Sequence, residues 1–276
     1  GDDVPSAYLG IFARLFWGPL AVGRRRGIRF GHCELWFGTS ALGLCPVAAC
    51  CGNPFVKFLT AAQILSQKRP DESLTLLMRH AERRHIAPED EDYGSKVPLT
   101  DRGRSQALAA GKEFSGFGGL FFFGSSPVFR CRETAALFAE GCGAAEFSVP
   151  EKVARFECLG DFYVNGFADY ERYLKEGFYP AVCRFIREGS LPGFLPLAEG
   201  SEKFLRFLLE NSSADLNVFC SHDAWIVPFL SHFTDVRFSP SRWLNFLSGA
   251  AILFSADKKA VRILPVAFLG DGWLRF

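Results

Sequence analysis

The sequence has no surplus of charge of either sign. Its 31 lysines and arginines nearly match its 30 aspartates and glutamates, so the formal net charge of the 276 residues is +1. A chain that bound nucleic acid through its bulk charge would carry a large basic excess, and we therefore expect no nucleic-acid partner. Recognition of any anion has to come from a local cluster of basic side chains.

Two familiar patterns of metal and serine chemistry are missing as well. The nine cysteines include no Cys-x-x-Cys pair, the spacing that commonly marks a zinc site. Buried thiols are therefore a better interpretation than a zinc site for the N-terminal group of His32, Cys33, Cys45, Cys50 and Cys51. No serine lies in a Gly-x-Ser-x-Gly turn, which is typical of serine hydrolases.

The cysteine count also bears on the cell compartment. Nine is an odd number, and several of the cysteines lie in apolar runs such as Val218-Phe219-Cys220. Scattered cysteines of this kind are typical of free thiols in a reducing environment, whereas secreted domains carry paired cysteines. We therefore expect a cytoplasmic location.

Residues 35–56 contain no charged side chain. A membrane-inserting hairpin or helix is one interpretation of such a stretch. Because glycines and prolines interrupt it, a packed apolar extension is favoured, and membrane contact through residues 1–72 is the alternative. A polar run at 66–72 closes this region. We therefore divide the chain into an apolar extension, residues 1–72, and a domain, residues 73–276.

From residue 73 onward, short apolar runs alternate with amphipathic segments. Strands are expected at 74–78, 120–123 and 216–220, a hairpin at 250–254 and 261–266, and helices from 101, at 132–140, at 204–209 and at 224–233. This alternation predicts a three-layer α/β/α sandwich with a largely parallel sheet. Residues 144–200 are mixed and rich in aromatic side chains, and we expect them to form a cap over the domain.

Polar residues directly follow three of the expected strands. They are Arg79 and His80 with Arg83, Ser126 with Arg130, and His222 with Asp223. Ligands of open α/β sheets bind at the carboxyl ends of the strands, so we expect these clusters to meet in one crevice. Arginine binds phosphate oxygens in a bidentate way, neutral histidine is a nucleophile, and a carboxyl can protonate a leaving oxygen. The clusters therefore suit chemistry on a phosphate ester.

Four segments carry motifs in a fixed order along the chain. They are Leu77-Met78-Arg79-His80-Ala81-Glu82-Arg83, Leu99–Ala107, Ser125–Ala135 and Ser221-His222-Asp223. They resemble, in that order, four motifs of the histidine phosphatase superfamily: the Arg-His-Gly/Ala signature, the Leu-Thr/Ser-x-x-Gly-x-x-Gln-Ala helix start, the Ser-Ser-Pro-x-x-Arg-x-x-x-Thr-Ala segment and the second histidine. The resemblance implies a phosphoglycerate mutase-like fold.

The resemblance also implies a role for each matched residue. His80 would attack phosphorus and carry a phosphohistidine. Arg79, Arg130 and His222 would bind the phosphoryl oxygens. Arg83 matches an additional arginine of the acid-phosphatase-like arrangement, although Arg84 stands where that arrangement usually has proline. Water would then hydrolyse the intermediate, and this scheme needs no metal and no organic cofactor.

The proton donor has two candidates. The acid-phosphatase-like arrangement places it directly after the second histidine, at Asp223, and the mutase arrangement places a glutamate at the position of Glu157. We favour Asp223 because Arg83 points to the same arrangement, and Glu157 remains the alternative. Asp223 could also serve only as the N-cap of the helix that follows it.

These observations predict a phosphomonoesterase that works through a phosphohistidine on His80 and acts on a phosphorylated small molecule or a phosphoprotein. One alternative is a phosphoglycerate-mutase-like phosphotransferase, which the lack of a mutase-like middle segment disfavours. Another is a non-catalytic phospholigand-binding module, which would have lost the nucleophile or an arginine. We expect substrate specificity to reside in residues 86–98 and 144–200.

Overall fold

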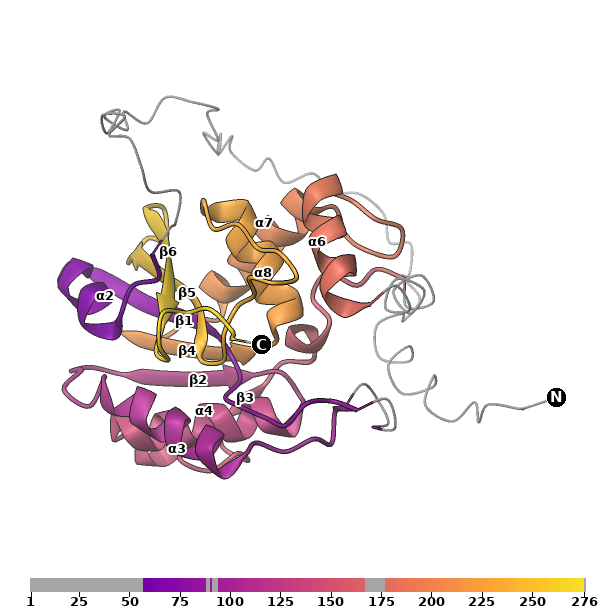
Figure 1. Cartoon of the computed structure of the whole chain (residues 1–276). Coiled ribbons are helices and arrows are strands. Elements are labelled where there is room, and N and C mark those ends of the chain that lie inside the picture. The colour runs from indigo at the N-terminus through magenta and orange to yellow at the C-terminus, as the bar shows by residue number, and fades with distance from the viewer. Residues whose placement is uncertain (1–56, 88–89, 91–93, 167–176, 276) are drawn as a thin grey trace, which may run out of the picture. The chain divides into compact units, whose positions relative to one another are not determined.

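The computed structural model describes residues 57–275, except 88–89, 91–93 and 167–176 (Figure 1). The uncharged stretch 35–56 and the cysteine group at 32–51 lie outside the described residues. Within the described ranges, no helix combines the length and the apolar character that crossing a bilayer requires.

One six-stranded sheet, in the order β3-β2-β4-β1-β5-β6, forms the middle of the domain. Its strands are β1 (Glu72–Arg79), β2 (Phe121–Ser125), β3 (Ala154–Arg155), β4 (Leu216–Ser221), β5 (Ser248–Ser255) and β6 (Val261–Ala267). The four strands from β3 to β1 are parallel. The hairpin β5–β6 adds two antiparallel strands on the other side of β1. The expected strands, the largely parallel sheet and the hairpin are confirmed.

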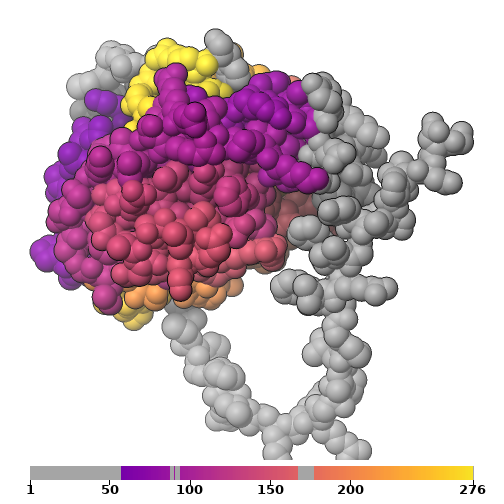
Figure 2. Space-filling view, turned by 90° about the horizontal axis from the view of Figure 1, so that it is seen from below, coloured from indigo at the N-terminus to yellow at the C-terminus, as the bar shows by residue number. Residues whose placement is uncertain are grey.

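Helices cover both faces of this sheet, as Figure 1 shows. One face carries α2 (Ala61–Gln67), α3 (Asp101–Lys112) and α4 (Phe129–Cys142), and the other carries α6 (Phe178–Glu188), α7 (Leu197–Glu210) and α8 (Asp223–Phe233). Atoms of α3 and α4 cover the surface seen from below (Figure 2). The arrangement has three layers, as the sequence predicted.

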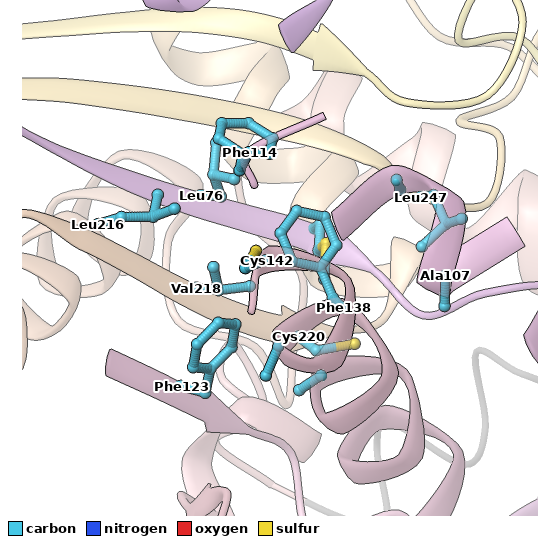
Figure 3. Packing of buried hydrophobic residues seen from close by; sticks show 14 of the residues in the cluster. Leu76, Ala107, Phe114, Phe123, Phe138, Cys142, Leu216, Val218, Cys220 and Leu247 are labelled. Atoms are coloured by element: carbon cyan, nitrogen blue, oxygen red, sulfur yellow. The ribbon is translucent and has the colours of Figure 1, made fainter. Parts of the chain in front are cut away.

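The central strand β1 contributes side chains to two separate hydrophobic cores, because neighbouring side chains of a strand point to opposite faces of the sheet. Leu76 and Met78 lie in the core under α3 and α4, whereas Leu77 lies in the core under α7 and α8. Figure 3 shows the first core, where Phe114 and Phe138 pack near Leu76. A strand buried on both faces needs a nearly continuous apolar run, which is what the sequence shows there.

Two helix starts show how local chemistry agrees or disagrees with the sequence pattern. Thr100 caps α3, as expected, because its side chain accepts a hydrogen bond from the Gly103 backbone N–H. Helix α7 begins at Leu197, earlier than the predicted helix at 204–209. Gly200 lies within this helix. The residue at this position is glycine because a Cβ there would lie 2.6 Å from the Tyr163 ring. Tight packing, which leaves no room for a side chain, explains this glycine better than a helix start does.

Residues 57–72, the end of the predicted extension, pack onto the sheet. Leu59 exchanges backbone hydrogen bonds with Pro265 and Ala267 at 2.9 and 3.0 Å. Ile64 of α2 is fully buried in the core that α3 and α4 also line. Together with the rest of the described residues, this segment belongs to one compact unit.

Candidate active site

The polar clusters lie where three adjacent parallel strands end. Strands β1, β4 and β2 end at Arg79, Ser221 and Ser125. The backbone N–H of His80 donates to Ser221 O at 3.1 Å, and that of Ser126 donates to Cys220 O at 2.9 Å. These bonds continue the ladder beyond the strands, so the side chains that follow each strand are held at one edge of the sheet.

His80 is buried, with 1% of its surface exposed. Its Nδ1 lies 2.8 Å from the carbonyl oxygen of Ala81. A carbonyl only accepts, so Nδ1 carries the hydrogen and the lone pair is on Nε2. Burial, and then the positive charges of Arg130 and Arg79, hold the pKa of His80 well below its usual value. The ring is therefore neutral near pH 7, the form in which histidine is a nucleophile.

His222 faces His80 edge-on. The two ring centroids are 5.6 Å apart and the planes meet at 69°. Nε2 of His222 lies 2.9 Å from Ser126 Oγ and 3.6 Å from the Sγ of the buried Cys131. The serine and the cysteine thus contact the second imidazole from β2 and α4, and they limit its freedom to rotate.

Arg79 and Arg130 are both held by carbonyl groups. Arg79 Nη1 donates to Leu244 O at 2.5 Å, and its guanidinium lies 4.3 Å from the centroid of the Phe246 ring. Arg130 Nη1 donates to Gly94 O at 2.6 Å. Both side chains are buried, with 2% and 6% of their surfaces exposed. Buried guanidinium groups are rare without paired anions. Arg130 has no ion pair among the described residues, so its position requires an explanation.

Three arginines at this edge keep an unused donor. The Nε atoms of Arg79, Arg83 and Arg130 are buried and have no hydrogen-bond partner among the described residues. Burial and repulsion from Arg130 lower the pKa of Arg83 to about 10, and burial also lowers the pKa of Arg130. Unsatisfied cationic donors beside a neutral imidazole form a site that an anion with several oxygens would complete.

Asp223 is the carboxylate that meets this cluster. Its Oδ2 lies 3.0 Å from Arg79 Nη2 and accepts a hydrogen bond from Trp243 Nε1 at 2.8 Å. Burial opposes the charged form, but Arg79, the Trp243 hydrogen bond and Arg83 outweigh it, so the pKa of Asp223 is lowered. The N-cap of α8 is His222, without a side-chain bond. The alternative in which Asp223 only caps this helix is therefore wrong.

Glu157 lies apart from these contacts. It begins the short 3-10 helix η3 (Glu157–Gly160), and its half-exposed side chain pairs with Arg155 at 2.6 Å. Its neighbour Leu159 accepts a hydrogen bond from Ser221 Oγ at 2.7 Å, so η3 borders the end of β4. Glu157 therefore lies in an element that borders the site, but its carboxylate forms an ion pair with the exposed Arg155.

The motifs do not contain several residues that complete the site. Trp243, Leu244 and Phe246 come from the segment between α8 and β5, and Tyr179 comes from α6. Aromatic residues make up 15% of the chain, so an aromatic side chain carries little signal of its own. Only the contacts of Trp243 and Phe246 with the motif residues distinguish them from core residues.

Metal ligands and disulfides are not part of this arrangement. Within the described ranges, no group of three or more His, Cys, Asp and Glu side chains is placed to hold a metal ion. The cysteines described there are free thiols: Cys131, Cys142, Cys158, Cys183 and Cys220.

The family model of the histidine phosphatase superfamily (branch 1) matches residues 75–156. This segment contains Arg79, His80, Arg83 and Arg130. A comparison with curated proteins found no match. Whether the chain is closer to the acid-phosphatase-like arrangement than to true mutases stays a prediction.

Solved structures with similar folds cover about the same part of the chain. Phosphoglycerate mutase from Bacillus anthracis str. Sterne is 13% identical, covers 72% of this chain and 94% of its own, and has a TM-score of 0.47. Mycobacterial glucosyl-3-phosphoglycerate phosphatase is 16% identical, with 72% and 100% covered and a TM-score of 0.43. A putative alpha-ribazole-5'-P phosphatase from Escherichia coli is 17% identical, with 72% and 98% covered and a TM-score of 0.43.

Proposed function

We propose that this chain, whose residues 75–156 match the family model of the histidine phosphatase superfamily (branch 1), hydrolyses a phosphate monoester through a phosphohistidine on His80. One observation carries the proposal. A buried, neutral imidazole with its lone pair on Nε2 lies among guanidinium groups whose Nε donors are unused. Transfer of a phosphoryl group uses both features, because the nucleophile attacks phosphorus and the cationic donors bind the phosphoryl oxygens.

In the proposed reaction, His80 Nε2 attacks phosphorus and the bond from phosphorus to the ester oxygen breaks. The leaving oxygen takes a proton from a carboxyl group, and the enzyme keeps a phosphohistidine. Water then attacks this phosphorus and gives a proton to the same carboxylate. The bond from phosphorus to His80 Nε2 breaks, which releases inorganic phosphate and restores the free imidazole. Arg79, Arg83, Arg130 and His222 would stabilise the phosphoryl oxygens in both steps.

Asp223 is the proposed proton donor. Its carboxylate lies within the arginine cluster, whereas Glu157 pairs with Arg155. The lowered pKa of Asp223 means that the free site holds a carboxylate near neutral pH. A bound phosphate would neutralise part of the positive charge of Arg79, which raises the pKa of Asp223 and favours its protonated form. An acidic optimum is therefore expected.

The substrate would be a phosphorylated small molecule or a phosphoprotein. The segments proposed to select it are residues 86–98 and 144–200, which include α6 and its Tyr179. The ring of Tyr179 meets that of Trp243 edge-on, with centroids 4.8 Å apart, so this part of the proposed cap touches the residues around Asp223.

The test is hydrolysis of 4-nitrophenyl phosphate by the full chain. We expect His80→Ala to lower kcat by ~10³-fold or more, because the nucleophile is lost. The matched control is His85→Ala, which removes an exposed histidine from the same loop and leaves turnover unchanged. Acid-labile radioactive phosphate should be trapped on the wild-type enzyme and not on His80→Ala. Unchanged turnover in His80→Ala would reject the proposal.

A further inference from the structure

A short stretch between α8 and β5, Trp243 to Phe246, surrounds the pair formed by Arg79 and Asp223. We call it the 243–246 segment. It supplies the Leu244 carbonyl and the Phe246 ring that contact the Arg79 guanidinium. The Phe246 ring also lies 5.8 Å from the ring of His80, centroid to centroid. None of these residues belongs to the four motifs, yet they account for most of the described contacts of Arg79.

Trp243 acts on the same pair through one atom. Its side chain is fully buried, and its Nε1 donates to Asp223 Oδ2 at 2.8 Å. The same Oδ2 faces Arg79 Nη2 at 3.0 Å. Indole nitrogen only donates, and an oxygen that receives two donors has no room for a proton. A proton that Asp223 donates must therefore come from Oδ1.

The indole is itself fixed on its other sides. Tyr179 of α6 meets it at 4.8 Å between ring centroids, and Phe178 and Phe238 meet it at 5.9 and 6.2 Å. Packing of three aromatic rings on an indole restricts its rotation. Trp243 is thus a rigid donor and cannot easily follow a carboxylate that moves.

We propose that Trp243 is a positioning residue, which fixes the Asp223 carboxylate against Arg79 and so presents Arg79 to the phosphoryl group. This inference rests on the proposed function and deepens it. A purely structural tryptophan would contribute to stability alone. A positioning tryptophan also sets the protonation of Asp223, and this difference can be measured.

Other charged or titratable groups also surround Asp223, and the test has to leave them in place. They come from β1 and the loop after it, from α4, from α6 and from the start of α8: Arg79, Arg83, Arg130, Tyr179 and His222. Removal of the indole N–H takes away one hydrogen-bond donor to the Asp223 carboxylate and leaves all of these charged and titratable groups in place. The pKa of Asp223 should then rise, because its anion loses a hydrogen bond.

The first variant replaces Trp243 with 3-benzothienylalanine, which has sulfur in place of the N–H and nearly the same shape. The second is Trp243→Phe. At a pH low enough for Asp223 to be protonated in both proteins, we expect kcat/KM for 4-nitrophenyl phosphate to fall about tenfold, a loss of the size of one hydrogen bond to a charged group. The limb of the pH profile that Asp223 controls should move to higher pH. In an Asp223→Asn background, the isostere should cause no further loss.

The control is Ser212→Ala, which removes the buried hydrogen bond between the hydroxyl groups of Ser212 and Thr75, 2.7 Å long. Ser212 precedes the start of β4, whereas the site follows the end of that strand. This substitution should lower Tm and leave the pH profile in place. If the Trp243 isostere likewise lowers only Tm, the inference is overturned. The same holds if the isostere still costs about tenfold in the Asp223→Asn background.

A second readout separates this inference from the proposed function. Titration of Asp223 by NMR in protein with ¹³C-labelled aspartate needs no substrate. If the wild-type chain hydrolyses no aryl phosphate, the proposed function fails, and the titration decides on Trp243 by itself. A higher pKa of Asp223 in the isostere supports the inference, and an unchanged titration overturns it.

Discussion

At the scale of single residues, the site depends on which nitrogen of His80 carries the hydrogen. The Ala81 carbonyl selects Nδ1 for it, and burial keeps the ring neutral. A histidine that was exposed at the same strand end would be partly protonated near pH 6.5 and would lose its lone pair to that proton. Burial in a cationic cluster, which is unfavourable for a protonated ring, therefore favours the neutral form that the proposed reaction requires.

The choice of proton donor gives a prediction at this scale. We expect Asp223→Asn to lower kcat by ~10²- to 10³-fold, with a larger loss for an alkyl phosphate than for 4-nitrophenyl phosphate, because a poor leaving group depends more on protonation. Since a donor must be protonated, wild-type activity should fall as pH rises through the lowered pKa of Asp223, and this limb should disappear in the variant. Glu157→Gln is the matched control. A loss that depends on the leaving group in Glu157→Gln would assign the donor to Glu157 instead.

Arg130 gives a second prediction. Its guanidinium is buried, has an unused Nε and is near two further arginines. We expect Arg130→Ala to weaken binding of inorganic phosphate or vanadate by about tenfold or more, measured by calorimetry, since charged hydrogen bonds contribute ~1.5–3 kcal/mol. The exposed Arg102, which pairs with Glu82 at 3.6 Å, is the control and should not affect affinity.

The same substitution separates binding from stability. Without ligand, Arg130→Ala should not lower Tm, because it removes a buried like charge from the arginine cluster. A variant that lost stability but kept its affinity for phosphate would contradict both expectations for Arg130.

At the scale of elements, the loop after β1 is held by the start of α3. Gly103 allows this contact, because a Cβ there would lie 2.2 Å from the Glu82 carbonyl oxygen. Thr100 reaches the same residue, with its backbone N–H 3.0 Å from Glu82 O. Helix α3 therefore positions the segment that begins with His80, although no side chain of α3 contacts the imidazoles in the described contacts.

We expect Gly103→Ala to destabilise the domain by ~1–3 kcal/mol, the usual cost of overpacking, and to lower kcat. Urea unfolding and turnover would measure the two effects. Gly116→Ala is the control, because a Cβ at Gly116 meets no atom within 4 Å, so this change should be neutral or slightly stabilising. Equal stability of the two variants would show that α3 does not need this close approach.

The elements also show which features a single sequence can predict. The strands ending at Arg79 and Ser221 were predicted because buried strands are continuous apolar runs with a defined end. The start of α7 was missed because Gly200 is there for a contact with Tyr163, which is distant in sequence. The contact of Trp243 with Asp223 was missed for the same reason, since no local pattern encodes a hydrogen bond between a loop and the start of helix α8. Motifs predicted the convergent imidazoles and arginines, and only coordinates show their supporting residues.

At the scale of the whole molecule, binding at the site should be linked to folding. The folded chain gathers Arg79, Arg83 and Arg130 around one point, and the unfolded chain does not. Phosphate or vanadate at 100 times its Kd should therefore stabilise the fold by about 2.7 kcal/mol, seen as a higher Tm. Chloride at equal ionic strength controls for screening. If both salts act alike, the arginines do not form an anion site.

The position of β1 between β4 and β5 also has a consequence for synthesis of the chain. Leu74 pairs with Leu216 on one side, and Thr75 pairs with Ile252 on the other. The partners of β1, the strand that precedes His80, thus emerge from the ribosome long after it does. Pairing between such distant segments is slow and leaves strand edges exposed in the meantime. A nascent chain that ends before β5 has His80 and its neighbouring arginines next to a strand with one unpaired edge, so the sheet that holds the proposed site is incomplete until β5 has been made.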